Sequence, residues 1–245
     1  HVIFCPDDSI EYADIVCTGE GEDALIELAQ DPTRTDIENL WFRKNGDIIR
    51  NQNRPLIADL DCLAFSSYGV NECLIEDNQF QTLPLEQNRK FYSDIFYVMT
   101  QRGCPYQCSY CTHATMRESL PHDKYLRRRS VEHVIRELEY QKPRLNLGTI
   151  PFVDDVLLVN LRWIKPFLEE YKKRINLPFG CYIHPCGGIE EMLGLAKDAG
   201  LVYVNVGIQS GSAYVLREIY NRHYSDEEMR RMCWRAHELG LMLLY

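Results

Sequence analysis

Short apolar runs alternate with helical segments over the second half of the chain. Runs rich in β-branched and aromatic residues predict strands at 95–100, 148–153, 179–185, 201–209 and 241–245. Apolar residues spaced three and four apart predict helices at 130–141, 161–174, 189–200 and 226–240. Ser130 is placed to cap the first of these helices, and Ser225 with Glu228 forms a capping box for the last. Strands separated by helices build parallel sheets, so we predict an α/β fold with a partial (β/α) barrel that needs more chain to close.

The first 94 residues have a different pattern. A strand at 13–18, a glycine turn and a helix from Glu22 precede a hairpin whose turn is Asn45–Gly46. From Arg54 to Asp94 the chain is polar and has no clear period, which is typical of a connector. We therefore divide the chain into 1–55, a connector 56–94 and a barrel 95–245.

The composition is that of a folded protein of one or two domains, with 245 residues, 45 % of them hydrophobic and 26 % charged. No apolar run reaches the roughly 18 residues of a membrane helix. The net charge of −9 is uneven, because residues 1–98 carry 7 basic and 19 acidic side chains and residues 99–245 carry 20 and 17. This acidic first half argues against nucleic acid as a partner. His1 is not a methionine and no leader follows it, so we expect a piece of a longer protein.

Three of the ten cysteines lie within eight residues, in the run CPYQCSYC that follows the first barrel strand. Thiols this close along the chain indicate a metal site in a reducing compartment, so we expect a cytoplasmic protein. Cys104, Cys108 and Cys111 supply three ligands for a 4Fe–4S cluster whose fourth iron has no protein ligand. The alternative is a structural zinc site that adds His113. Zinc ligands are usually split into two pairs across a fold, which favours the cluster.

The CxxxCxxC spacing, with Tyr110 directly before the last cysteine, resembles the radical S-adenosylmethionine (SAM) superfamily. Residues 99–245 follow the partial barrel of that superfamily in order. The resemblance implies that Cys104, Cys108 and Cys111 hold a 4Fe–4S cluster whose open iron binds the amino and carboxylate groups of SAM. It further implies reductive cleavage of the sulfonium to a 5′-deoxyadenosyl radical. The cysteine loop then lies at the C-terminal end of a strand, where barrel enzymes have their active sites.

Within the superfamily, the chain resembles the cobalamin-binding branch in the segments KYLRRRSVEHVIREL, PFVDDVLLVN and YVNVGIQSGSAYVLREIYNRHYSDEEM. Upstream, ADIVCTGEGEDALIEL resembles the C-terminal part of the Rossmann-like cobalamin domain of that branch. The resemblance assigns residues 1–55 to this domain and implies cobalamin as a third cofactor, with Gly19, Glu20 and Gly21 near the corrin. The DxHxxG motif that can supply a histidine to cobalt does not occur in the sequence, and the third strand ends in His184–Pro185–Cys186 where an arginine-containing segment is more usual.

Polar residues at other strand ends are candidates for binding SAM. Asp154 and Asp155 follow the second strand, where a carboxylate suits the ammonium group of SAM, and capping of the next helix is the alternative. The resemblance puts the turn that contains Gln209 and Ser210 against the ribose and methionine of SAM, and a plain turn with a helix N-cap is the alternative. Arg222 is a candidate for the methionine carboxylate, with an ordinary surface arginine as the alternative. We interpret the arginines at 127–129 as a solvated charged face, with a contact from one of them to a cofactor or substrate carboxylate as the alternative, and no catalytic residue is assigned.

The leading hypothesis is a cobalamin-dependent radical SAM enzyme that methylates an unactivated carbon of a small molecule or peptide, with a reductant such as a flavodoxin or ferredoxin. A radical cyclase or rearrangement enzyme with the same cofactors is one alternative. A second is a methylthiotransferase of transfer RNA, whose barrel has a similar QSGS stretch, although no three-cysteine set for a second cluster lies upstream. The third is a zinc-stabilised binding module without catalysis.

Overall fold

The computed structural model describes residues 2–66, 73–82, 94–120 and 125–245. The chain divides into two units, one formed by His1–Asp59 with Gly103–Arg127 and the other by Leu60–Arg102 with Arg128–Tyr245. Neither unit is a continuous stretch of sequence. The boundaries expected from the sequence, at 1–55, 56–94 and 95–245, stay a prediction, and residues 67–72 and 83–93 of the expected connector lie outside the described residues.

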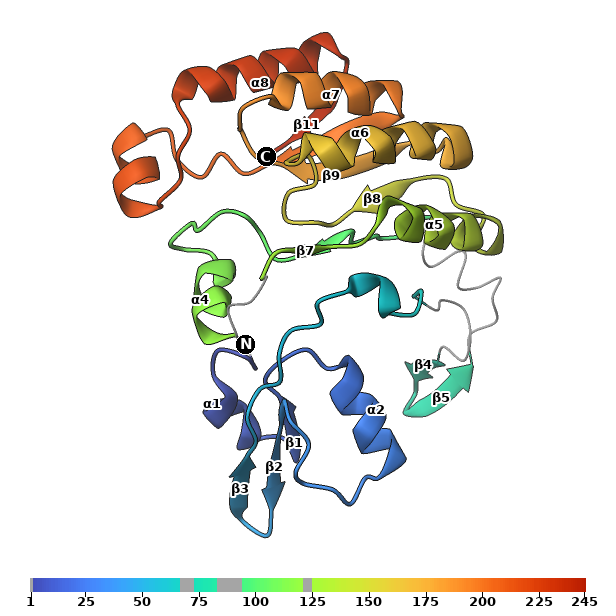
Figure 1. Cartoon of the computed structure of the whole chain (residues 1–245), viewed down its shortest axis with the longest axis vertical. Coiled ribbons are helices and arrows are strands. Elements are labelled where there is room, and N and C mark those ends of the chain that lie inside the picture. The colour runs from blue at the N-terminus through green and yellow to red at the C-terminus, as the bar shows by residue number, and fades with distance from the viewer. Residues whose placement is uncertain (1, 67–72, 83–93, 121–124) are drawn as a thin grey trace. The chain divides into compact units, whose positions relative to one another are not determined.

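The larger unit is built on a parallel sheet (Figure 1). Its strands hydrogen-bond in the order β11–β10–β9–β8. Their bounds are Ile150–Phe152 for β8, Phe179–Ile183 for β9, Leu201–Val206 for β10 and Met242–Leu244 for β11. The segment that precedes the cysteine loop joins β8 by two parallel bridges, from Ile95 to Thr149 and from Val98 to Phe152. The predicted strand at 95–100 is therefore present only as this pair of bridges, and the other four strands form where the pattern predicts them.

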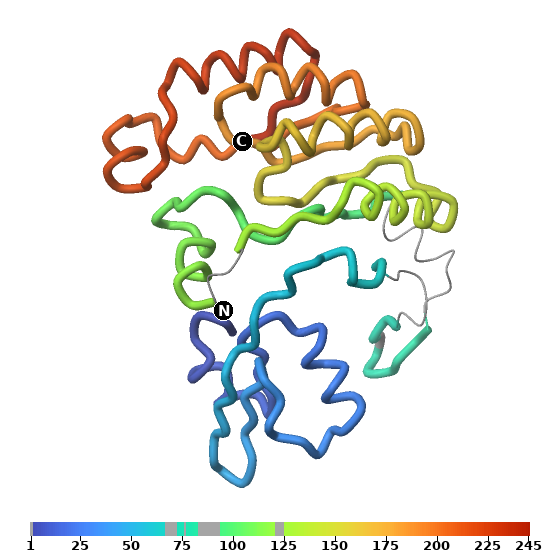
Figure 2. The backbone as a smooth tube through the Cα atoms, viewed as in Figure 1, coloured from blue at the N-terminus to red at the C-terminus, as the bar shows by residue number. Residues whose placement is uncertain are grey.

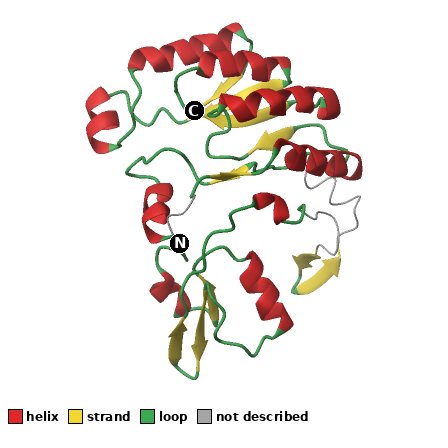
Figure 3. Ribbon diagram, viewed as in Figure 1, coloured by secondary structure: helices red, strands yellow, loops and turns green. Residues whose placement is uncertain are grey.

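Helices connect the strands and lie along one face of the sheet (Figure 3). Their bounds are Val131–Leu145 for α5, Leu161–Glu170 for α6, Ile189–Asp198 for α7 and Asp226–Glu238 for α8. Two π-helices accompany them, η2 (Tyr171–Ile175) directly after α6 and η3 (Val215–Ile219) before α8. Both predicted caps form, because the Ser130 hydroxyl accepts from the His133 amide at 3.1 Å and Ser225 with Glu228 makes the capping box.

The main core lies between the sheet and these helices. Phe152, Phe179 and Val204 are fully buried, and the Phe152 ring packs edge-on against Phe167 of α6 with 5.5 Å between ring centroids. Tyr182 and Met242 point to the opposite face of the sheet and are exposed. Side chains alternate between the two faces of a strand, so these buried side chains share the face that the helices cover.

The smaller unit contains an antiparallel sheet in the order β1–β2–β3. Its elements are α1 (Pro6–Ile10), β1 (Ile15–Cys17), α2 (Glu22–Gln30), β2 (Leu40–Lys44), β3 (Asp47–Arg50) and, from the second segment, α4 (Thr112–Ser119). The predicted hairpin turn is confirmed, since Asn45 and Gly46 have φ angles of 54° and 89°. A small core of Ala24, Leu40 and Phe42 joins helix to sheet. Figure 2 follows the backbone through both segments of this unit.

The described part of the expected connector contains structure that the sequence pattern did not indicate. It includes a short 3₁₀ helix η1 (Leu60–Cys62) and a hairpin of β4 (Cys73–Glu76) with β5 (Gln79–Thr82). All four residues of β5 are exposed. Because this strand buries no face, its sequence needs no alternation of apolar and polar residues. The strands β6 (Gln101–Arg102) and β7 (Arg127–Arg128) have two residues each. They lie at the two ends of the segment Gly103–Arg127 along the chain. Across the described ranges, no helix combines the length and apolar character needed to cross a membrane.

Candidate functional site

The cysteine loop begins at a glycine that no other residue can replace easily. Gly103 has a φ of +87°, and a Cβ atom there would lie 2.6 Å from the Tyr125 carbonyl oxygen. Cys104 and Cys108 are then buried, whereas Cys111 is half-buried and directly precedes the first residue of α4. The Cys111 amide donates to the Cys108 carbonyl at 2.9 Å, which closes a turn between the last two cysteines. The loop is a structured turn that leads directly into a helix.

Residues of α4 and of the segment after it support this loop. The Arg117 guanidinium donates to the Cys104 carbonyl at 2.6 Å and lies over the Tyr125 ring, 5.2 Å from its centroid. The Tyr125 hydroxyl is hydrogen-bonded to Nδ1 of His113. Tyr125 is buried in a small apolar cluster with Leu56 and Leu120. Neither Arg117 nor Tyr125 belongs to a motif, so no signal in the sequence points to them.

The donor set of the loop fits a thiolate-ligated metal centre. Three thiols favour iron–sulfur clusters or zinc over harder cations, and the described ranges contain no disulfide that would occupy them. In these ranges, no three His, Cys, Asp or Glu side chains are gathered tightly enough to hold a metal ion. The assignment of the loop to a metal therefore rests on thiol chemistry and spacing. His113, the fourth ligand of the zinc alternative, uses Nδ1 for its contact with Tyr125.

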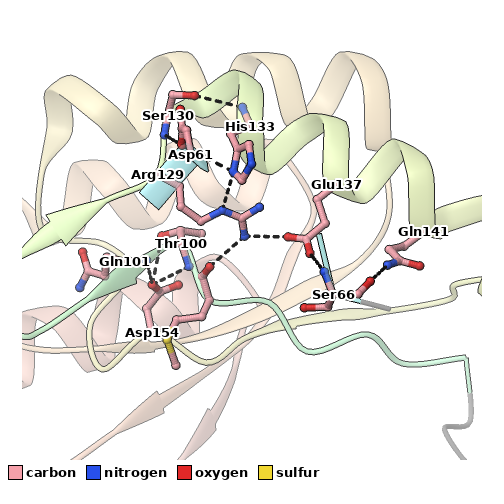
Figure 4. A network of polar contacts seen from close by, with 11 residues as sticks. Asp61, Ser66, Thr100, Gln101, Arg129, Ser130, His133, Glu137, Gln141 and Asp154 are labelled. Carbon is pink, nitrogen blue, oxygen red and sulfur yellow. Dashed lines mark hydrogen bonds and ion pairs between the residues drawn. The ribbon is translucent and has the colours of Figure 1, made fainter. Parts of the chain in front are cut away.

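The two aspartates that follow β8 have different environments, which the sequence alone did not distinguish. Asp154 is 1 % exposed, whereas Asp155 is exposed to solvent. Oδ1 of Asp154 accepts hydrogen bonds from the Gln101 amide at 2.7 Å, the Thr100 amide at 2.8 Å and the Thr100 hydroxyl at 3.1 Å (Figure 4). Burial raises the pKa of Asp154 from its ordinary value of 3.8 to about 6, against the opposing effect of these hydrogen bonds.

The arginines at 127–129 are not a solvated face, so this expectation was wrong. Arg127 is buried and donates to Oε2 of Glu20 at 2.8 Å. Arg128 donates to the Gln101 side chain and lies over the Trp163 ring, 4.6 Å from its centroid. Arg129 forms a salt bridge of 2.7 Å with Glu137, whose side chain is 4 % exposed. Each guanidinium therefore has a specific acidic, amide or aromatic partner, which a run of three equal charges does not show.

Arg129 belongs to a polar network that lines a cavity of about 360 Å³ in the larger unit. Figure 4 shows that Asp61 and Ser66, from the expected connector, reach α5 through this network. Asp61 accepts from the Ser130 amide at 2.9 Å, and the Ser66 amide donates to Glu137 at 2.9 Å. Arg129 and Glu137 of this lining are paired with each other, and the contacts of Asp61 and Ser66 fasten residues 60–66 to α5.

The turn after β10 holds the other predicted SAM contacts. Gln209 has a φ of +65°, and Ser210 accepts from the Ser212 amide at 3.1 Å. Arg222 is only 9 % exposed and donates to the Gly207 carbonyl at 2.6 Å. It is therefore not an ordinary surface arginine. Burial, together with the neighbouring Arg222, lowers the pKa of His184 to about 4, so this histidine is neutral at pH 7.

The glycine turn of the smaller unit has structural partners of its own. A Cβ atom on Gly19 would lie 2.5 Å from the Asn39 side chain, and Gly21 precedes the first residue of α2. Besides Arg127, Oε2 of Glu20 accepts from the Ile57 amide at 2.7 Å. Tyr110, in the cysteine loop, is 45 % exposed. Cobalamin contacts for the turn and a cofactor contact for Tyr110 stay predictions.

The fold is a parallel sheet with helices along one face, and a loop with three thiols follows its edge segment. Enzymes that bind an iron–sulfur cluster at the end of a barrel strand have this combination. Residues 98–243 match the model of the Radical SAM superfamily, and the chain belongs to this superfamily. A radical SAM domain carries a 4Fe–4S cluster and uses SAM.

Two named methyltransferases are similar to the chain. One is the Uncharacterized methyltransferase PH0819 of Pyrococcus horikoshii, 28 % identical over 227 residues, which cover 89 % of this chain and 46 % of that protein. The other is the Cytidylyl-2-hydroxyethylphosphonate methyltransferase of Streptomyces wedmorensis, 25 % identical over 61 % of this chain and 27 % of that protein. The chain thus spans about half or less of the length of the curated relatives it matches.

A solved structure shows the same fold. The radical SAM methyltransferase TsrM of Kitasatospora setae, solved with tryptophan substrate and a SAM analogue, superposes with a TM-score of 0.73 at 19 % identity. The match covers 99 % of this chain and 47 % of that protein. A second structure of TsrM, with cobalamin and a 4Fe–4S cluster bound, gives a TM-score of 0.71 at 18 % identity. The predicted α/β fold of the radical SAM type is therefore confirmed.

Proposed function

We propose that the protein is a cobalamin-dependent radical SAM methyltransferase that methylates an unactivated carbon of a small molecule or peptide. The observation that carries the proposal is the CxxxCxxC loop, which follows the edge segment of the parallel sheet within the residues that match the superfamily. Cys104, Cys108 and Cys111 would hold the cluster as thiolates. When bound, the cluster supplies the electron that cleaves the sulfonium of SAM.

Residues of each unit have a proposed role with these cofactors. Arg117 fixes the backbone at Cys104, and Tyr125 and His113 hold the turn into α4. The exposed carboxylate of Asp155 is suited to the ammonium group of SAM. Gln209, Ser210 and Arg222 belong to a turn whose side chains we propose to orient the rest of SAM.

Cobalamin as the methyl carrier rests on two further observations. The upstream segments resemble the cobalamin-binding branch of the superfamily, and the fold match to cobalamin-bound TsrM extends over 99 % of the chain, including the smaller unit. We further propose a cytoplasmic location and a flavodoxin or ferredoxin as reductant, because thiolate ligands and a reducible cluster both need a reducing compartment.

The test uses the full-length protein, prepared and reconstituted without oxygen. We expect about four iron and four sulfide per chain, formation of 5′-deoxyadenosine from SAM under reduction, and corrinoid absorbance retained after hydroxocobalamin is added and the protein desalted. Near-stoichiometric zinc without sulfide would refute the enzyme and support the zinc module. Cluster and SAM cleavage without retained corrinoid would leave a radical SAM enzyme and remove cobalamin.

A further inference from the structure

The residues just before the cysteine loop are held by a single buried carboxylate. Oδ1 of Asp154 accepts from two consecutive amides, those of Thr100 and Gln101, and from the Thr100 hydroxyl. All three distances lie between 2.7 and 3.1 Å. Oδ1 therefore has little remaining capacity to accept a hydrogen bond from a ligand, and the second oxygen, Oδ2, is buried away from solvent.

Gln101 is also held through its side chain. Its Nε2 donates to the Val156 carbonyl at 3.1 Å, and its Oε1 accepts from Nε of Arg128 at 2.8 Å. Arg128 is in turn fixed over the Trp163 ring. Gln101 is 3 % exposed, and it makes contacts through its backbone amide and through both ends of its side chain. Arg102 and Gly103 then connect it to Cys104, so this clamp fixes the backbone from which the cysteine loop begins.

We infer that Asp154 is a positioning residue for the cysteine loop, which acts through the amides of Thr100 and Gln101, and that it does not bind SAM itself. Asp155, which is exposed, is then the member of the pair suited to reach a ligand. The inference rests on the proposed function to the extent that the loop must hold a cluster.

The structure offers a conservative variant that separates the two roles. Oδ2 of Asp154 is buried and has no hydrogen-bond partner among the described residues. In Asp154→Asn, the remaining Oδ1 can accept the same three hydrogen bonds, and the new amide replaces an atom that makes none. This variant keeps the clamp but removes the negative charge that the ammonium group of SAM would require.

The experiment compares full-length wild-type protein with Asp154→Asn, Asp154→Ala and Asp155→Ala after anaerobic reconstitution. It records iron and sulfide per chain, the electron paramagnetic resonance spectrum of the reduced cluster before SAM is added, SAM affinity, and the rate of 5′-deoxyadenosine formation. We expect Asp154→Ala to alter the SAM-free spectrum and to lower the rate at least tenfold. We expect Asp154→Asn to restore both the spectrum and the rate to within about twofold of wild type. Asp155→Ala should leave the SAM-free spectrum unchanged and weaken SAM binding tenfold or more.

A SAM affinity lost in Asp154→Asn with an unchanged SAM-free spectrum would identify Asp154 as a SAM ligand and overturn the inference. A wild-type spectrum and rate in Asp154→Ala would overturn it as well. If Asp154→Ala does not fold, Asp154→Asn still decides between the two roles. A wild-type protein that takes up no iron and sulfide would instead refute the proposed function, so the two failures are distinguishable.

Discussion

At the scale of single residues, the neighbours Asp154 and Asp155 differ in their exposure to solvent and in their hydrogen-bond partners. Both carboxylates follow β8, but one is buried under two amides and the other faces solvent. A sequence places an aspartate at a strand end and does not say which of two adjacent side chains turns inward. Asp154, which turns inward, has a raised pKa, so the free energy of unfolding depends on pH through this carboxyl.

Asp154 makes the folded protein less stable as its carboxyl ionises. Its pKa of about 6 lies above the ordinary 3.8, so the folded protein binds the proton more tightly than the unfolded chain does. The contribution to the free energy of unfolding is therefore lost as pH rises from about 4 to about 6. Relative to wild type, Asp154→Asn should gain about 2 kcal/mol between pH 4 and pH 7. Urea unfolding of both proteins at each pH measures this gain, and parallel pH curves would contradict it.

The three loop cysteines should behave differently from the scattered ones. Cys104→Ala, Cys108→Ala or Cys111→Ala each removes one of three cluster ligands, so we expect reductive cleavage of SAM to be abolished. Matched controls are available at cysteines outside the loop, namely Cys5, Cys17, Cys62 and Cys233. Their alanine variants should keep the wild-type content of iron and sulfide. Full loading and activity in Cys108→Ala would refute the assignment.

At the scale of elements, the larger unit was predictable and the connector was not. Strands β8 to β11 and helices α5 to α8 formed where apolar periodicity placed them, because each buries one face against the same core. All four residues of β5 are exposed, so this strand has no buried face that periodicity could report. The partners of the arginines at 127–129 were missed for a related reason, since pairs such as Arg127 with Glu20 join residues far apart in the sequence. Periodicity reports local geometry and not long-range polar contacts.

Helix α5 carries a buried ion pair that should be costly to break. Glu137→Ala leaves Arg129 buried without its carboxylate and deprives the Ser66 amide of its acceptor. We expect a loss of about 3–5 kcal/mol in the free energy of unfolding. Glu132→Ala on the same helix is the matched control, because its salt bridge to Arg174 is exposed, and it should have a much smaller effect. Equal losses of unfolding free energy for the two variants in chemical denaturation would contradict a larger contribution from the buried Arg129–Glu137 pair.

At the scale of the whole molecule, the cysteine loop belongs to the same unit as the N-terminal residues. Arg127, at the end of the loop segment, is paired with Glu20, and the two side chains are only 5 % and 14 % exposed. Leu56 packs with Leu120 and Tyr125. A division of the chain by sequence pattern alone assigns these partners to different domains. Only the structure shows that they stabilise each other.

Removal of Glu20 should therefore affect the cluster even though Glu20 lies in the N-terminal segment. Glu20→Ala breaks the buried contact with Arg127, so we expect lower iron and sulfide per chain and a lower melting temperature. Asp23→Ala, whose side chain is 61 % exposed, is the control and should load normally. Loss of corrinoid binding with full cluster content in Glu20→Ala would instead indicate a contact with cobalamin.

The discontinuous smaller unit also sets an order of events on the ribosome. Translation adds about 5–20 residues per second, so Arg127 is synthesised on the order of several seconds after Asp59. During that interval Glu20 and Leu56 have been made, but the segment that buries them has not. The contacts that hold the cysteine loop form only after Arg127 has left the ribosome. Iron that reaches the nascent chain earlier would find a loop without these contacts.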